Sequence, residues 1–111
     1  MIDWTRIAEL RNDVLGEDFA EVFEIFTEEI ETVLRRLRDT PNFSTIEGDF
    51  HLMKGSAVNM GFFEFGELCR AAEKACAAGN AMAIDVEQLF DCYELSLDAL
   101  KSRSEELGLA A

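Results

Sequence analysis

The stretch from residue 19 to residue 37 constrains the fold of this chain most strongly, because its apolar residues recur at spacings of three and four. An α-helix turns by about 100° per residue, so this spacing places the apolar side chains along one side of a single long helix. The residues are Phe19, Val22, Phe23, Phe26, Ile30, Val33, Leu34 and Leu37. A helix with one apolar side needs further elements to pack against it.

Residues that favour helix ends predict the rest of the secondary structure. With the long helix over about 17–38, helices are expected over 3–16, 44–60, 63–78 and 85–107. Asp3 and Asp85 are suited to cap helix N-termini, and Ser44 with Glu47 three residues later forms a capping box. Glycines stand at three of the expected helix ends, where a left-handed residue is often needed: Gly16, Gly61 and Gly79.

Signals for β-strands are nearly absent, since the chain contains no alternating β-branched run and no Asn-Gly hairpin. A length of 111 residues suffices for one domain with its own core and is too short for two. We therefore expect a single all-α domain over residues 1–111: an antiparallel up-and-down four-helix bundle with a short extra N-terminal helix that covers one end.

The charge of the chain excludes several classes of partner. With 23 acidic and 10 basic residues, the formal net charge is −13, whereas nucleic-acid binding depends on clusters of Lys and Arg. The same charge disfavours anionic membrane surfaces. No apolar run approaches the roughly 20 residues that span a bilayer, and the N-terminus has no signal-peptide pattern. We expect a cytoplasmic, monomeric protein that binds neither nucleic acid nor membranes.

The three cysteines Cys69, Cys76 and Cys92 are expected to be reduced thiols that pack as small apolar residues. They lack CxxC spacing, and the chain has one histidine, so a zinc site has no adequate set of ligands.

That histidine, His51, is predicted to be exposed although it lies in the middle of a helix. Over 44–60, the apolar residues that form the buried side are Ile46, Phe50, Met53, Ala57 and Met60. His51, Gly55 and Val58 project onto the opposite side, and Lys54 lies between the two.

The surroundings of His51 suit phosphoryl transfer. Imidazole titrates near neutral pH, so a neutral, nucleophilic ring is available. Gly55, one turn later, costs roughly 1 kcal/mol in a helix interior, but its missing side chain leaves the ring open to a large partner. Lys54 can offset the charge of a phosphoryl group, and Val58 offers an apolar spot for docking. The competing interpretation is an ordinary solvated surface histidine with no role.

The segment HLMKGSAVNMGFFEFGELCRAAE, from His51 to Glu73, resembles the signature of histidine-containing phosphotransfer (HPt) domains. The matching residues are His51, Lys54, Gly55, Ser56, Ala57, Asn59, Gly61, Cys69 and Glu73. A looser resemblance covers Leu15 to Asp18 and Phe26, so that it extends over nearly the whole chain.

This resemblance implies a four-helix bundle, often with an extra N-terminal helix, and a role for each matched position. His51 would be phosphorylated, Lys54 would help hold the phosphoryl group, and Gly55 would provide clearance for a receiver domain. Ser56 and Asn59 would be supporting residues, and Glu73 would lie close to the active-site face.

Two departures from the family pattern concern packing. Met53 stands where many members have leucine, an exchange that conserves volume. Phe62 and Phe63 stand where smaller residues are frequent; they could fill the core or enlarge a docking surface, and we expect them in the core.

The resemblance predicts a carrier that accepts a phosphoryl group on His51 from a receiver aspartate, or from a histidine kinase system, and passes it to another response regulator. Its partners would be receiver domains and a sensor histidine kinase. It would have no cofactor of its own, Mg²⁺ would belong to the receiver, and it would lack ATP-dependent kinase activity. The alternative is a helical adaptor that binds receivers or kinases without relaying phosphate. A hydrolase lacks support, because no catalytic constellation is evident.

Overall fold

The structure is a computed structural model that describes residues 2–10, 12 and 18–107, of which 104–107 by backbone alone. Its helices are α1 (Trp4–Glu9), α2 (Phe19–Asp39), α3 (Ile46–Met60), α4 (Phe63–Ala77), the short 3₁₀ helix η3 (Ala81–Ala83) and α5 (Val86–Leu107). The described residues form no strand, which confirms the expected all-α class. The helix end expected at Gly16 and the start expected at about Glu17 lie outside the described residues.

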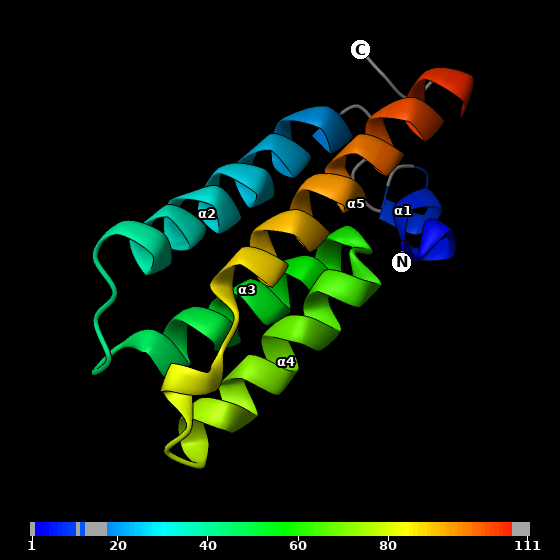
Figure 1. Ribbon diagram of the computed structural model, residues 1–111. Coiled ribbons are helices and arrows are strands. Elements are labelled where there is room, and N and C mark those ends of the chain that lie inside the picture. Colours follow the sequence, from blue (N-terminus) through cyan, green and yellow to red (C-terminus); the bar gives the residue numbers. More distant parts are fainter. Residues whose placement is uncertain (1, 11, 13–17, 108–111) are drawn as a thin grey trace.

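The four long helices form an antiparallel bundle (Figure 1). Each packs against the next in the chain, and α5 returns to pack against α2. Successive helices run in alternating directions, with α2 and α5 side by side above α3 and α4 in this view. The short helix α1 contacts α3 near one end of the bundle. The expected up-and-down bundle with an extra N-terminal helix is therefore confirmed.

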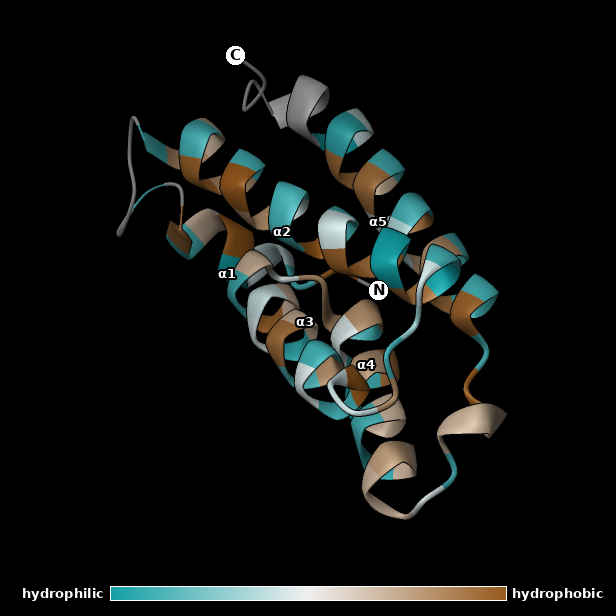
Figure 2. Cartoon of the chain, turned by 90° about the vertical axis from the view of Figure 1, so that its left-hand side faces the viewer, coloured by the Kyte–Doolittle hydropathy of each residue, from teal (hydrophilic) through white to brown (hydrophobic). Residues whose placement is uncertain are grey.

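The core contains most of the apolar residues that the helical spacing predicts. All five residues of the predicted buried side of α3 are at most 6% exposed. On α2, Phe19, Ile30, Val33, Leu34 and Leu37 are buried. Apolar and polar surfaces alternate along α2, as expected of a helix with one apolar side (Figure 2). Burial of this shared apolar surface is the main stabilising contribution to the bundle.

One ion pair between α2 and α3 agrees with the rotation of α3 that its buried apolar side sets. Arg36 of α2 donates to the carboxylate of Asp49 on α3, with 2.6 Å between Nη2 and Oδ1. Asp49 is only 8% exposed, and a charge this well buried needs such a partner. Because Asp49 is held against α2, the opposite side of α3 faces outward, and that side carries His51.

The predicted caps are confirmed at two helix starts. The side chain of Asp3 accepts a hydrogen bond from the Arg6 backbone at 3.1 Å, at the start of α1. At the start of α5, the side chain of Asp85 accepts one from the Gln88 backbone, also at 3.1 Å.

The capping box predicted at Ser44 and Glu47 is wrong. Helix α3 begins at Ile46, and Thr45 precedes it without a side-chain capping bond. The Asn42 side chain accepts hydrogen bonds from both the backbone and the hydroxyl of Ser44, at 3.0 and 2.6 Å. This local Asn turn engages the Ser44 hydroxyl that the capping box would need.

Gly61 joins α3 to α1, and its replacement by alanine is expected to destabilise the protein by about 1 to 3 kcal/mol. Its φ is +80°, a left-handed conformation, and its carbonyl accepts a hydrogen bond from the Asp3 backbone at 2.7 Å. An added Cβ would lie 2.8 Å from the Asp3 carbonyl oxygen, so α1 would have to shift. The free energy of unfolding in denaturant measures the effect.

Gly48→Ala is the matched control for that prediction. Gly48 is exposed on α3, and an added Cβ meets nothing within 4 Å. This variant should gain up to about 1 kcal/mol from the better helix propensity of alanine. If Gly61→Ala also left stability unchanged or higher, the α1–α3 junction would not depend on this glycine.

Candidate functional site

The structure confirms that His51 is exposed in the middle of α3. Its side chain is 69% exposed. Gly55, one turn later, is exposed as well, and an added Cβ there would meet nothing within 4 Å. Because no contact inside the bundle requires a glycine at position 55, its absent side chain leaves space only on the outside, beside the imidazole.

The structure places only some of the other predicted site residues of α3 on the exposed side with His51. Val58 is 60% exposed and Asn59 is exposed, so both lie on the outer side of the helix. Ser56 is buried at 7% exposure, because five residues turn a helix by about 140° from His51. The structure thus brings Val58 and Asn59, but not Ser56, to the exposed face.

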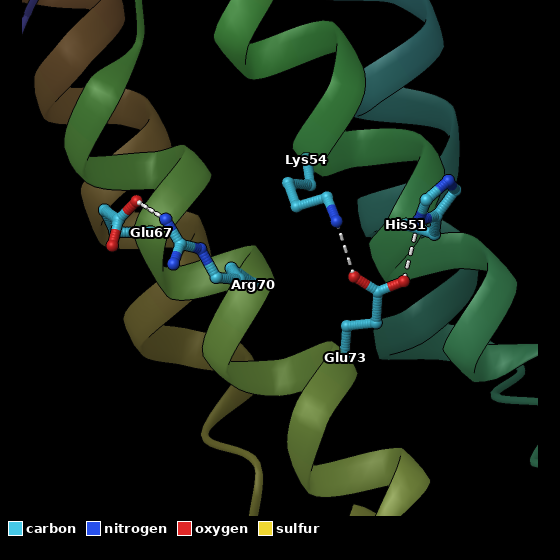
Figure 3. A network of polar contacts seen from close by, with 5 residues as sticks. All are labelled: His51, Lys54, Glu67, Arg70 and Glu73. Atoms are coloured by element: carbon cyan, nitrogen blue, oxygen red, sulfur yellow. Dashed lines mark hydrogen bonds and ion pairs between the residues drawn. The ribbon is translucent and has the colours of Figure 1, made fainter.

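A carboxylate from the neighbouring helix connects His51 and Lys54 (Figure 3). Glu73 of α4 places Oε2 at 2.7 Å from Nδ1 of His51 and Oε1 at 2.8 Å from Nζ of Lys54. The three side chains are 23% (Glu73), 30% (Lys54) and 69% (His51) exposed. Spacing within one helix could not predict this contact, because it requires α4 to pack against α3; only the family resemblance indicated Glu73.

The two contacts keep Glu73 ionised. The hydrogen bond from Lys54 lowers the pKa of Glu73 below its ordinary value of 4.5, and that from His51 acts in the same direction, while desolvation opposes both. A carboxyl group whose pKa is lowered by folding stabilises the fold at pH values above its unfolded-state pKa. This contribution is lost as the pH falls through its folded-state pKa. The bridge is therefore present at neutral pH and is lost in acid.

The ionised carboxylate determines which tautomer His51 adopts. A carboxylate can only accept hydrogen bonds, so Nδ1 of the ring must be the donor and must carry the proton. In the neutral ring the other nitrogen, Nε2, then keeps its lone pair. The arrangement presents an unprotonated ring nitrogen on the open side of α3.

Glu73→Ala should release this tautomer preference. In the wild type, ¹⁵N NMR of the neutral imidazole should show a protonated Nδ1 and an unprotonated Nε2. Without the carboxylate, the ring should populate both tautomers, and both nitrogen shifts should move toward intermediate values. Glu67→Ala is the matched control on α4, because Glu67 pairs with Arg70 at 3.0 Å instead. Unchanged ring shifts in Glu73→Ala would contradict the assigned role of Glu73.

A shallow depression between α3 and α4 lies beside this site. The residues that line it include Lys54, Gly55, Val58, Asn59, Phe63 and Arg70. Phe62 is fully buried, as expected, but Phe63 is 59% exposed, so its predicted place in the core is wrong. The left-handed turn at Gly61 makes Phe62 the residue before α4, which points inward, and Phe63 its first residue, which faces outward.

None of the hydrogen bonds that join His51, Lys54 and Glu73 involves a cysteine, although the charge of Glu73 contributes to the raised pKa of Cys76. All three are free thiols, and Cys69 is buried. Burial is the main cause that raises the pKa of Cys69 to about 12, and it also raises the pKa values of Cys76 and Cys92. Such thiols stay protonated at neutral pH and are poor nucleophiles.

The described part of the chain bears on two further features, a metal site and a membrane-spanning helix. Within it, no group of three or more His, Cys, Asp or Glu side chains could hold a metal ion. None of its helices combines the length and the apolar character that crossing a membrane requires.

Comparison with known proteins gives the family. Searches of the curated proteins and of the solved structures found no match. A family model described as the Hpt domain matches residues 6–103, which include all the residues of the His51 site. Hpt domains are phosphoryl carriers of two-component signalling that interact with receiver domains and kinases and lack kinase activity of their own. Because the match spans nearly the whole chain, this protein belongs to the Hpt domain family.

Proposed function

We propose that this protein is a phosphorelay intermediate that accepts a phosphoryl group on His51 from a receiver-domain aspartate and passes it to another response regulator. One observation carries the proposal: the carboxylate of Glu73 lies 2.7 Å from Nδ1 of the exposed His51 and 2.8 Å from Nζ of Lys54, an arrangement that favours a proton on Nδ1 and leaves Nε2 with its lone pair. The match to the Hpt family supports it.

The transfer step follows from this tautomer. The lone pair of Nε2 attacks the phosphorus of the aspartyl phosphate, the N–P bond forms, and the P–O bond to the aspartate breaks. The receiver carboxylate leaves with the electron pair. No proton has to leave Nε2, because the ring carries it on Nδ1. Transfer to the next receiver is the reverse of this step.

Glu73 and Lys54 have complementary roles in the phosphorylated state. The ring then has a proton on Nδ1 and phosphorus on Nε2, so it gains positive charge, which the carboxylate of Glu73 offsets. The ammonium of Lys54 offsets the negative charge of the phosphoryl oxygens. This matters in a protein whose net charge is −13.

The remaining components would come from the partners. A sensor histidine kinase would supply the phosphoryl group to the relay from ATP, and the receiver would hold the Mg²⁺ that assists transfer from its aspartate. The carrier itself would need no cofactor. Its contribution is a positioned nucleophile and a surface on which receivers dock.

The test is the intact mass of the protein after incubation with phosphorylated receiver domains and, separately, with a small phosphoramidate donor. The expected result is a gain of one phosphoryl group that is lost in acid, as a phosphorus–nitrogen bond should be. No gain from either donor would refute the relay and favour an adaptor that binds receivers without carrying phosphate. Receiver binding would then be the property to measure.

A further inference from the structure

We propose that Phe63 is the anchor by which a receiver partner binds at the depression beside His51. This side chain then determines the affinity of the protein for the receiver. This inference rests on the proposed function, because that function is the reason for expecting a receiver domain as the partner that binds there. It assigns to Phe63 a part in docking that is separate from the chemistry at His51.

A large aromatic side chain is exposed at this place. Phe63 and Val58 are 59% and 60% exposed, and both line the depression. Gly55 and Gly66 also line the depression, so part of its surface has no side chain. At Gly66, an added Cβ would lie at ordinary contact distances from Ala57 and Val58, 3.5 and 3.8 Å, so α4 packs closely on α3 at this place. Exposed apolar groups around a hollow are typical of an interaction surface, and aromatic residues often anchor such interfaces.

The depression is continuous with the surface around His51. Lys54 and Gly55 line the depression and are also neighbours of His51 on α3. Lys54 is three residues after His51 and Gly55 is four residues after it. A receiver that brings its aspartyl phosphate to Nε2 must cover this side of α3. Its surface therefore extends over the depression and reaches Phe63 at the start of α4.

The charge of the depression differs from that of the protein as a whole. The protein as a whole is strongly acidic, yet the charged residues that line the depression are two basic ones, Lys54 and Arg70, and one acidic one, Glu67. Both basic residues are paired, Arg70 with Glu67 at 3.0 Å and Lys54 with Glu73 at 2.8 Å (Figure 3), so the depression carries no excess negative charge. The depression thus avoids the repulsion that the rest of the surface would exert on an anionic phosphorylated partner. A receiver bearing an aspartyl phosphate fits this surface.

The experiment measures receiver binding directly. The probe is an isolated receiver domain of the source organism, chosen as the tightest binder to the wild type and loaded with beryllium fluoride in place of its phosphoryl group. Phe63→Ala should raise the Kd in calorimetry about tenfold, as for loss of an interface anchor. Leu95→Ala is the matched control: Leu95 is 58% exposed on α5, which packs against α2 and α4. It should change the Kd less than about twofold.

Kinetic measurements separate docking from chemistry. In transfer from the phosphorylated receiver, Phe63→Ala should raise KM and leave kcat unchanged, and the small phosphoramidate donor should phosphorylate His51 at the wild-type rate. Unchanged melting temperatures of both variants show that the fold is intact, as expected for half-exposed side chains.

Each other outcome is informative. An unchanged Kd in Phe63→Ala, an equal loss in Leu95→Ala, or no receiver binding to the wild type would overturn the inference. So would a wild-type dimer in sedimentation that Phe63→Ala dissociates, because a second copy would then occupy the depression. If Phe63→Ala weakens binding although His51 of the wild type accepts no phosphoryl group from any donor, the docking inference stands and the relay fails.

Discussion

The His51→Gln variant should gain no phosphoryl group from a phosphorylated receiver or from a small phosphoramidate donor, whereas the wild type gains one from each. A glutamine amide is not a nucleophile, so the loss should be complete. The chain contains no second histidine that could accept the group instead. Intact-protein mass spectrometry measures the result.

The same variant should keep its fold and its affinity for receivers. The His51 side chain is 69% exposed and contacts the rest of the site through Glu73, and the glutamine amide can donate a hydrogen bond to that carboxylate in its place. Circular dichroism and the Kd for the receiver should therefore match the wild type. An acid-labile phosphoryl gain in His51→Gln would place the acceptor elsewhere, and loss of the helical spectrum would show that the side chain supports the bundle.

Gly55→Gln should reduce transfer from a phosphorylated receiver by about 100-fold or more, because a displacement of about 1 Å between reacting groups can have that effect. The new side chain would stand one turn from His51, on the side that the receiver must approach. Phosphorylation by the small donor should be nearly unaffected, since a small molecule can pass the added side chain. Rates of phosphoryl transfer from both donors measure the difference.

Stability separates this steric effect from damage to the fold. An added Cβ at position 55 meets nothing within 4 Å, and glutamine favours a helix by about 0.5 to 1 kcal/mol over glycine. Gly55→Gln should therefore unfold at a higher denaturant concentration than the wild type while it transfers more slowly. Gly55→Ala should show the same gain in stability and a smaller loss of transfer. Wild-type transfer rates in the glutamine variant would show that receivers approach His51 from another side.

The sequence was sufficient to predict the helices and to predict which side of α3 carries the site. Both follow from local spacing: a repeat of three and four residues specifies which side of a helix is apolar, and the bundle buries that side. The five residues expected on the buried side of α3 are buried, and His51, Gly55 and Val58 are exposed. Local signals were less reliable at the start of α3, where Asn42 binds the Ser44 side chain that was expected to cap the helix.

The tertiary structure alone decided how this face becomes a site. Glu73 is distant from His51 in the sequence, and its carboxylate reaches both His51 and Lys54 only because α4 packs antiparallel to α3. The same packing buries Phe62 and exposes its neighbour Phe63, although both are equally apolar in the sequence. Helical periodicity describes one helix at a time, so the sequence by itself determined which residues face outward. Contacts between helices depend on how their surfaces fit, and the contact with Glu73 on α4 favours Nδ1 as the ring nitrogen of His51 that carries the proton.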